Sequence, residues 1–426
     1  MSTRVFVQNI TQAGAFKNQK SGVCFLMSEL DVNVFKSVEP KIDQLGKGCY
    51  IARNYGPSNA GFIITGEGVV VIDATVSPMQ AKGVLSEIRK LTDQPIKHLI
   101  YTHGHQDHVQ GAKVFRDAGA TIIGQRNVIE RFNRYNKLRK QHIRMNSLQF
   151  QVELTEEDWT YNNYPDVHYN CEYIFRLGNK TFHLFHGKGE TNDATVVYIP
   201  EEEVAYVGDF VMWVFPNIGN PQKVIRYERE WYETLERILS MEPKAVGTGH
   251  GPSLLDDKSI KSCLGDNIAV LKYLHEECIK HINEGSSLEQ MLEEIQLPKK
   301  LAVSPYIPQT YGRREFVIRG IHRRYTGWFD GNPANLDPAP QKEINSVILS
   351  LIGGKKLIEK VKSLSEEEGK QRLALHLLDL IGEDDLEYRE ARQLRIRLLE
   401  DLAAKHDNLF YRNFYSGFAV REKNCK

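Results

Sequence analysis

The chain has 426 residues, of which 41% are hydrophobic, so it can bury a large core and form a catalytic domain with a smaller second domain. Lys and Arg balance Asp and Glu at 55 each, which argues against nucleic acid or an anionic membrane surface as the main partner. No apolar stretch reaches the roughly 18 residues of a membrane span, and the amino end lacks the basic and apolar pattern of a leader. Six scattered cysteines without CxxC spacing indicate reduced thiols, so we expect a cytoplasmic protein.

The first third of the chain predicts a sheet with one covering helix. Residues 1–45 are mixed in character and are expected to form an N-terminal arm on the catalytic domain. Residues 48–75 contain short apolar segments separated by turns, as expected of antiparallel strands. Residues 79–92 have helical spacing and should present one apolar face, formed by Val84, Ile88 and Leu91.

Four side chains of metal-ligand type follow the apolar segment that ends at Thr102. They lie within six residues: His103, His105, Asp107 and His108. On an extended or turning backbone the first two histidines point to one side, whereas Asp107 and His108 turn toward a second position. The pattern therefore predicts that one short loop after a strand contributes to two metal positions.

The segment 126–176 is basic in its first part and rich in Tyr and Asn in its second. One interpretation is a lid or substrate wall, with Tyr161, Tyr164 and Tyr169 at a pocket and a cation near a bound anion. The alternative is a solvated helix followed by a packed surface loop. Both interpretations stay open at this point.

Three later strand ends offer the remaining ligands that such a loop requires. Glu190 follows the apolar segment that begins at Phe182, with His186 as the alternative ligand nearby. Asp209 closes the short strand that begins at Val204, and a carboxylate there can bridge two cations. His250, between two glycines after another apolar strand, would complete the second metal position.

The rest of the chain is expected to be largely helical. Residues 260–282 and 287–295 have helical spacing and should cover the sheet. A proline-rich connector then marks a domain boundary, which gives three predicted regions: an arm over 1–45, a catalytic domain over 46–335 and a helical domain over 336–426. Apolar residues three and four positions apart predict amphipathic helices from residue 341 onward.

The series of strand-end ligands resembles the metallo-β-lactamase superfamily, with its HxHxDH motif, downstream ligands and GHG ending, along residues 50 to 252. This resemblance implies an α/β fold, the four-layer αβ/βα sandwich, with a dinuclear site that usually holds two Zn²⁺, although another divalent metal is an alternative. Carried over by position, the first metal would have His103, His105 and Glu190 as ligands. The second would have Asp107, His108 and His250, and Asp209 would bridge them.

The same resemblance assigns two further residues near the site. Asp73 is similar to the superfamily's first Asp, which braces the site through hydrogen bonds and is not a ligand. Glu190 stands where most members have His, and this is typical of the alkylsulfatase branch. In the family register the ligand directly precedes a Thr, as Glu190 does, whereas His186 lies four positions too early.

Two stretches beyond the metal motif also resemble the alkylsulfatase branch. Residues 325–336 are similar to its GWFDGNPxxL connector, and residues 412–417 resemble its closing RNxYLxGA segment. The helical region 341–405 between them looks like the branch's dimerisation domain, which implies a homodimer through the C-terminal helices. The family's sterol-carrier-like C-terminal domain is not expected in this chain.

The resemblance implies hydrolysis of an alkyl sulfate to an alcohol and inorganic sulfate through a metal-bound hydroxide, with Asp107 and Asp209 as catalytic residues. The substrate would be a small anionic ester oriented by Asn217 and Arg226. Two departures concern this pocket: the bridging residue is Asp209 where the sulfatases have Glu, and Arg226 lies about four residues late. Hydrolysis of another ester, lactone or thioester is therefore one alternative. Iron-dependent oxidoreduction on the same fold is another, and a nuclease is disfavoured by the neutral charge.

Overall fold

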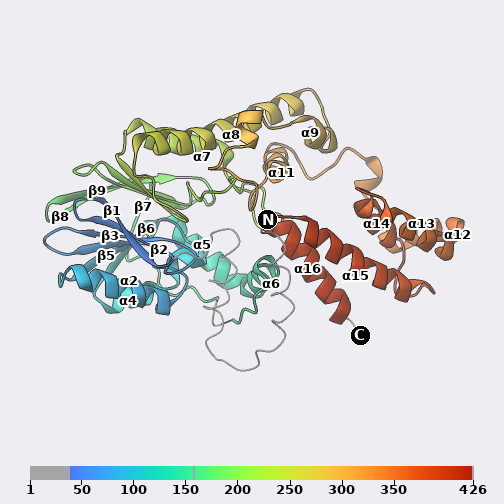
Figure 1. Ribbon diagram of the computed structural model, residues 1–426, viewed down its shortest axis with the longest axis horizontal. Coiled ribbons are helices and arrows are strands. Elements are labelled where there is room, and N and C mark those ends of the chain that lie inside the picture. The colour runs from blue at the N-terminus through green and yellow to red at the C-terminus, as the bar shows by residue number, and fades with distance from the viewer. Residues whose placement is uncertain (1–38, 157–158, 425–426) are drawn as a thin grey trace, which may run out of the picture.

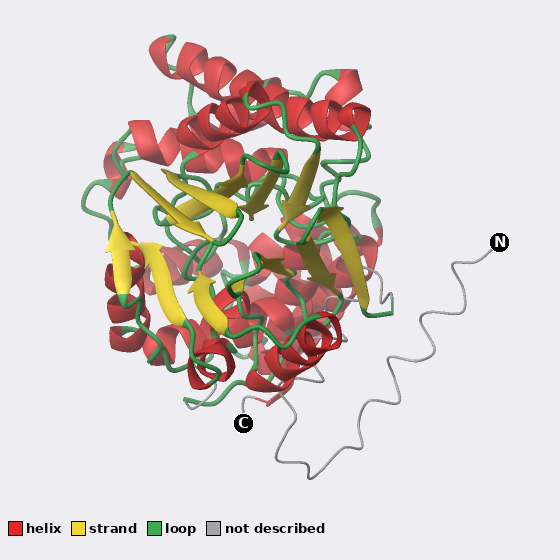
Figure 2. Ribbon diagram, turned by 90° about the vertical axis from the view of Figure 1, so that its left-hand side faces the viewer, coloured by secondary structure: helices red, strands yellow, loops and turns green. Residues whose placement is uncertain are grey.

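The computed structural model of the protein describes residues 39–156 and 159–424. Two β-sheets lie face to face and are enclosed by helices on both outer sides (Figures 1 and 2). The first sheet has seven strands in chain order: β1 (Lys41–Gly46), β2 (Cys49–Arg53), β3 (Ala60–Ile64), β4 (Val69–Ile72), β5 (Ile96–Ile100), β6 (Thr121–Gln125) and β7 (Val167–Tyr169). The second sheet has five, in the order β12 (Ala245–Thr248), β11 (Val204–Gly208), β10 (Ala194–Ile199), β9 (Lys180–Gly187) and β8 (Glu172–Leu177).

Strand β4 shows why the two sheets stack with helices outside them. All four of its residues are buried, because both faces of the strand are covered. Val69 and Val71 pack into the cluster beneath the outer helices, whereas Val70 and Ile72 pack into the cluster between the two sheets. The alternation of side chains along a strand thus divides four apolar residues between two cores.

Helices cover the outer face of each sheet (Figure 1). The first sheet is covered by α2 (Pro78–Leu91), α3 (Gln106–Val109), α4 (Ala112–Asp117) and α5 (Asn127–Lys137), and α6 (Arg139–Phe150) follows. The second is covered by α7 (Glu228–Ser240), α8 (Asp257–Asn283), α9 (Leu288–Glu294), α10 (Lys299–Ala302) and α11 (Arg314–Tyr325). Ser287 caps α9 in a reciprocal capping box with Gln290, which satisfies two backbone donors at that helix start.

The sandwich confirms the predicted fold class and corrects two details. Residues 41–46 form the edge strand β1, so the boundary expected at residue 45 falls within the sheet. The rest of the expected arm, residues 1–38, lies outside the described residues. In α2, Val84 and Ile88 are buried as predicted, but Leu91 is exposed because it is the last residue of the helix and extends beyond the sheet.

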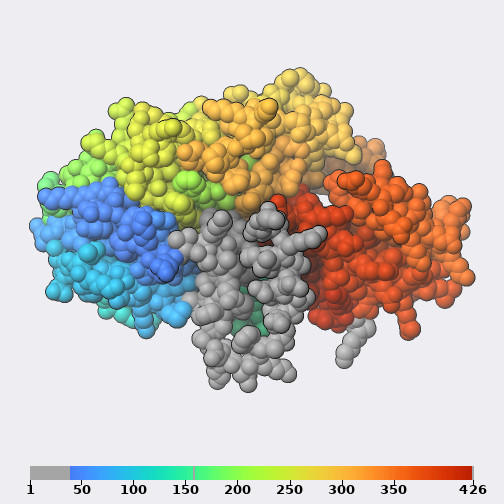
Figure 3. Space-filling model, in the orientation of Figure 1, coloured from blue at the N-terminus to red at the C-terminus, as the bar shows by residue number. Residues whose placement is uncertain are grey.

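Five helices at the C-terminal end form a separate lobe beside the sandwich (Figure 3). They follow the short 3-10 helix η3 (Pro333–Asn335) and comprise α12 (Gln341–Ile352), α13 (Gly354–Glu366), α14 (Gln371–Leu378), α15 (Tyr388–Lys405) and α16 (Leu409–Asn424). The lobe has its own apolar cluster, which includes Leu357, Val361 and Leu378. Helix α16 also touches the sandwich, since the Asn413 amide donates to the Gln149 carbonyl at 2.8 Å. The boundary at residue 335 stays a prediction.

Two expectations from composition can be compared with the described part of the chain. Within residues 39–156 and 159–424, no helix is long and apolar enough to cross a membrane. Cys49, Cys171, Cys263 and Cys278 are free thiols there. Burial raises the pKa of the Cys49 thiol to about 12, so it behaves as a small apolar side chain of the core.

Candidate metal centre

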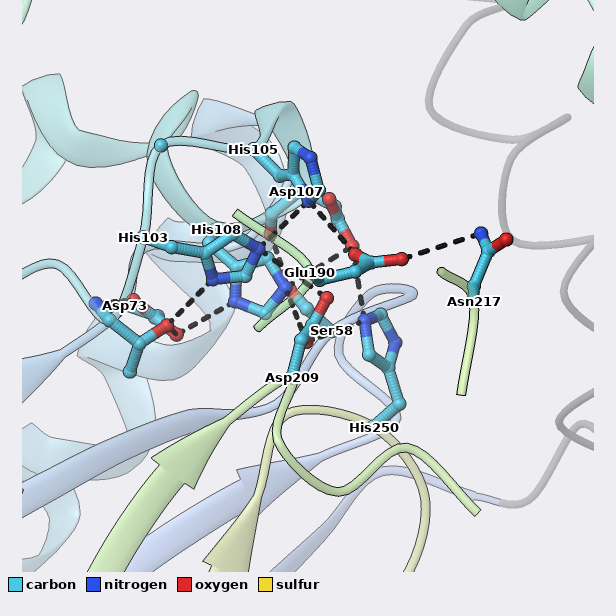
Figure 4. Close-up of polar contacts among 12 residues, drawn as sticks. Ser58, Asp73, His103, His105, Asp107, His108, Glu190, Asp209, Asn217 and His250 are labelled. Carbon is cyan, nitrogen blue, oxygen red and sulfur yellow. Dashed lines mark hydrogen bonds and ion pairs between the residues drawn. The ribbon is translucent and has the colours of Figure 1, made fainter. Parts of the chain in front are cut away.

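Side chains that can bind metal gather where strands of both sheets end (Figure 4). Parallel pairing of β4 with β5 and of β11 with β12 brings the carboxyl ends of these strands to one edge. Each contributes residues to that edge: Asp73 after β4, the loop 103–108 after β5, Glu190 between β9 and β10, Asp209 after β11 and His250 after β12.

The first group of potential ligands contains His103, His105, Glu190 and Asp209. His105 Nδ1 lies 2.9 Å from His103 Nε2 and 3.2 Å from the Glu190 carboxylate. His103 Nε2 lies 3.4 Å from Asp209 Oδ2. All four donor atoms lie within 4.8 Å of one another, which is the spacing of ligands around one ion.

The second group contains Asp107, His108 and His250 and adjoins the first. The Nε2 atoms of both histidines lie 3.2 Å from Asp209 Oδ1. His250 Nε2 is 3.3 Å from Asp107 Oδ2. One oxygen of Asp209 therefore faces the first group and the other faces the second, so this carboxylate can serve both.

Hydrogen bonds behind the two groups fix the ring orientations. Asp73 Oδ2 contacts His108 Nδ1 at 2.7 Å and accepts from the Thr102 hydroxyl at 2.6 Å. His250 Nδ1 lies 2.8 Å from the Pro57 carbonyl. These contacts occupy the Nδ1 atoms and direct both Nε2 atoms inward, which is how metal-binding histidines are usually held.

Two glycines permit the close approach of the strand ends. Gly208 has a positive φ of +49°, and a Cβ there would lie 2.7 Å from Thr102. A Cβ at Gly249 would lie 2.3 Å from Asp209 Oδ1. A side chain at Gly249 would displace the shared carboxylate, and one at Gly208 would displace Thr102, which donates to Asp73. The glycines before Asp209 and His250 are therefore steric requirements of the site.

The charges of the site are strongly coupled. Burial lowers the pKa of His250, but Asp209 and Asp107 outweigh it and raise that pKa to about 9. Burial likewise disfavours the charged form of His108, yet Asp209, Asp107 and Asp73 raise its pKa well above the ordinary value. Burial raises the pKa of Asp107, whereas His108 and His250 lower it to about 2. In the metal-free site the positive charge of the protonated imidazoles thus offsets the negative charge of the carboxylates, which bound metal ions would otherwise offset.

The donor set fits divalent metal ions. His108 Nε2 and Asp209 Oδ1 are buried and lie 3.2 Å apart, but neither makes a hydrogen bond of acceptable geometry with the described residues. Buried polar atoms are rarely left unsatisfied, and both atoms point into the space between the ligand groups (Figure 4). Imidazole nitrogens and carboxylate oxygens together suit zinc and related transition metals.

The two residues expected to hold the substrate anion contact Glu190 instead. Arg226 is buried, ion-pairs with the Glu190 carboxylate and donates to the Asn217 carbonyl at 2.9 Å. Asn217 is fully buried, and its amide nitrogen faces Glu190 at 3.4 Å (Figure 4). Arg226 still reaches the cavity wall, whereas Asn217 lies behind Glu190 and not on that wall.

The alternative ligand His186 is not in either group. Its Nε2 lies 3.0 Å from the Asn192 carbonyl, on the far side of the loop that carries Glu190. Glu190 is the residue of this loop that contacts His105, at 3.2 Å.

A cavity with largely apolar walls opens in front of the two ligand groups. The insert that follows β6 supplies much of the wall, including Tyr135, His142, Trp159 and Tyr161. The interpretation of this insert as a substrate wall therefore applies to Tyr161. It does not apply to Tyr164, whose hydroxyl donates to Asn133, or to Tyr169, whose hydroxyl donates to Thr195 inside the sandwich.

Sequence reasoning missed the pair Arg131–Asp193, which supports the ligand loop. Asp193 is fully buried, accepts from the Gly104 backbone N–H at 2.9 Å and pairs with Arg131 at 2.9 Å. It thereby ties the loop between His103 and His105 to helix α5. The only signal was an Asp three residues after Glu190, and its partner lies 62 residues away in the chain.

Two family models match the chain along most of its described length. The metallo-beta-lactamase superfamily matches residues 53–250, which contain both ligand groups. Residues 53–250 of the chain belong to the metallo-β-lactamase superfamily. The second family model, named alkyl sulfatase dimerisation, matches residues 287–424. The chain therefore also carries the C-terminal region of the alkylsulfatase branch, as predicted.

Curated relatives of this metallo-β-lactamase superfamily chain include alkylsulfatases. It is 25% identical to a linear primary-alkylsulfatase from Pseudomonas sp. over 375 residues, which cover 82% of this chain and 71% of that protein. It is 24% identical over 400 residues to an (R)-specific secondary-alkylsulfatase from Pseudomonas sp., covering 86% of this chain and 60% of the relative.

A solved structure supports the same fold. The stereoselective inverting sec-alkylsulfatase Pisa1 from Pseudomonas sp. superimposes with a TM-score of 0.80 at 21% identity and covers 90% of this chain. The match spans 66% of the Pisa1 chain. The superfamily member described here thus corresponds to roughly two thirds of the length of these relatives.

Proposed function

We propose that the protein is a hydrolase of alkyl sulfate esters that works with two divalent metal ions, zinc being the expected metal. The observation that carries this proposal is the pair of ligand groups sharing Asp209 at the end of a cavity with apolar walls. The relatives named as alkylsulfatases favour a sulfate ester over the other substrates of this fold.

The seven predicted ligands would hold the two ions in the groups that the geometry suggests. His103, His105 and Glu190 would bind one ion; Asp107, His108 and His250 the other; Asp209 would contact both. When bound, the ions would supply Lewis acidity toward the ester oxygens and lower the pKa of water toward neutrality.

The protein's own residues prepare this chemistry. Asp73 and the Pro57 carbonyl accept from Nδ1 of His108 and His250, so that each ring, once it has lost its second proton, would present a free Nε2 to a metal ion. Arg226 ion-pairs with the Glu190 carboxylate, which also contacts His105. The aromatic walls at Tyr135 and Trp159 exclude water and suit an alkyl tail.

Substrate assays test the proposal. Purified protein is supplied with Zn²⁺ and incubated with primary and secondary alkyl sulfates, and free sulfate is measured alongside alcohol. We expect sulfate release that disappears after chelation and in Asp107→Ala, the ligand exposed most directly to the cavity. Cleavage of neutral esters, lactones or thioesters without sulfate release would show that the protein is a hydrolase but does not act on sulfate esters. Redox turnover with iron would show that it is not a hydrolase.

Metal binding should depend on pH in a direction set by the histidines. Because the pKa of His250 is about 9 and that of His108 is also raised, both rings carry protons at neutral pH in the metal-free protein. Since a ligating imidazole must be neutral, we expect the release of about two protons per chain at pH 7 and a rising metal affinity up to about pH 9. Calorimetric titration in buffers of different ionisation enthalpy counts these protons. An affinity that does not change between pH 6 and 9 would contradict the assigned ligands.

The C-terminal lobe suggests a homodimer, in agreement with its match to a dimerisation family. Helix α12 presents apolar residues at helical spacing to solvent: Ile344, Val347, Ile348 and Leu351. Val347 and Leu351 are 61% and 81% exposed, which is unusual for a stripe of this kind unless a partner covers it.

We expect the double substitution Val347→Glu and Leu351→Glu to convert the dimer to a monomer, because charges would be buried in the interface. Sedimentation velocity measures the change. Ser346→Glu, on the opposite side of the same exposed helix, is the control and should stay dimeric. A double variant that keeps the wild-type mass would place the interface elsewhere.

A further inference from the structure

The cation expected to bind the substrate anion is already engaged. Arg226 is 3% exposed, pairs with Glu190 and donates to the Asn217 carbonyl. Burial lowers its pKa to about 10, so it stays charged at neutral pH, but much of that charge is neutralised by Glu190. Apart from the charge that bound metal ions would supply, Arg226 therefore has little charge left for an anionic substrate.

Lys223 is a second cation of the cavity wall, and unlike Arg226 it is not paired with a carboxylate of the described residues. It is partly buried and lines the cavity with Arg226. Its ammonium lies 5.7 Å from the centroid of the Phe150 ring, and its side chain forms no ion pair or hydrogen bond with the described residues. It lies in the lengthened stretch between Asn217 and Arg226, the part of the chain that departs from the family pattern.

The Lys223 side chain lines the same cavity as Asp107 of one ligand group and as His105 and Glu190 of the other. Burial lowers the pKa of Lys223, and the Asp107 carboxylate acts in the opposite direction. Lys223 thus lies on the wall of the cavity in which a substrate head group would meet the metal ions.

Neighbouring polar atoms of the wall also lack partners. The Tyr161 hydroxyl and His142 Nε2 are buried without a hydrogen-bond partner among the described residues, as is Arg134 Nε. All three residues line the same cavity as Lys223. Buried donors of this kind are expected to be satisfied when a ligand with several acceptor oxygens enters.

We infer that Lys223, supported by the Tyr161 hydroxyl and Arg134, binds the negatively charged head group of the substrate, so that the lengthened loop replaces Arg226 in this role. The inference rests on the proposed function and specifies how its substrate is selected. A head group with three acceptor oxygens, such as a sulfate or sulfonate, suits these donors, and the apolar wall accommodates the attached chain.

Binding of a substrate analogue that cannot be hydrolysed tests the inference separately from catalysis. Calorimetry on the protein supplied with Zn²⁺ compares octane-1-sulfonate, which is anionic, with octan-1-ol, which is neutral. In Lys223→Met we expect the Kd for the sulfonate to rise about tenfold or more, because a charge-assisted contact is lost. The Kd for the alcohol should stay within about twofold. Lys223→Arg should retain most of the sulfonate affinity, and Lys82→Met, on the exposed face of α2, should behave as wild type.

Three outcomes would overturn the inference: no sulfonate binding by the wild type, an unchanged sulfonate affinity in Lys223→Met, or an equal loss of sulfonate and octanol affinity. Sulfate release by the wild type is measured in parallel. Release with an unchanged Lys223→Met affinity would leave the proposed function intact and reject Lys223. If sulfonate binding depends on Lys223 but the wild type releases no sulfate, the proposed function is wrong and the anion-binding role of Lys223 still holds.

Discussion

Replacing Asp209 with alanine is expected to abolish sulfate release, by at least about a thousandfold, and to reduce the metal content of the protein. The reason is its position: Oδ2 faces His103, and Oδ1 faces both His108 and His250. One substitution therefore removes a ligand from both groups. Removal of any other ligand weakens only one group directly, so Asp209→Ala should lose more metal than Asp107→Ala.

Metal analysis and sulfate assays on the same preparation check this expectation. Asp117→Ala, a carboxylate exposed at the end of α4, is the matched control and should keep metal and activity. Circular dichroism verifies that the Asp209 variant is folded. Retention of two ions per chain in Asp209→Ala would show that this carboxylate does not bridge the two groups.

The second large effect concerns stability. Arg131→Met should lower the free energy of unfolding by about 3–5 kcal/mol, because Asp193 would be left charged and unpaired in the interior. The side chains of this pair are 5% and 0% exposed. Since Asp193 also accepts from the Gly104 N–H, the variant should bind metal more weakly even where it is folded.

Urea denaturation of the metal-free protein measures this difference without the contribution of bound ions. Arg116→Met is the matched control, because Arg116 pairs with Asp166 at the surface, where the two side chains are 36% and 39% exposed. It should lose no more than about 1 kcal/mol. Equal losses in the two variants would contradict a structural role for the buried pair.

The parts of the site that follow directly from strand ends could be predicted from the sequence. A short apolar run that ends in Gly-Asp or Gly-His indicates a strand and the side chain placed at its edge, as at Asp209 and His250. Parallel pairing then brings such ends together whatever the intervening loops contain. The four-layer sandwich was predicted from the resemblance of these motifs to the metallo-β-lactamase superfamily, and not from the apolar segments themselves.

Contacts between side chains on different loops could not be predicted in this way. Arg226 was expected to face the substrate and does line the cavity, but no pattern predicted that it also pairs with Glu190, 36 residues earlier in the chain. The exposure of Leu91 was not predicted for a simpler reason. Helical spacing shows on which face of a helix a residue lies, but it does not show where along the helix the contact with the sheet ends. Ion pairs between distant loops and the burial of a helix end both depend on how the whole chain packs, and local sequence patterns carry little information about either.

The two-ion centre is tested most directly by counting metal ions on the wild-type protein. Native mass spectrometry of metal-free protein titrated with Zn²⁺ gives the number bound per chain, and mild conditions preserve the subunit assembly. We predict two ions per chain at saturation, with sulfate release appearing as both positions fill. Saturation at a single ion, or at none, would contradict a site in which Asp209 is shared between two ligand groups.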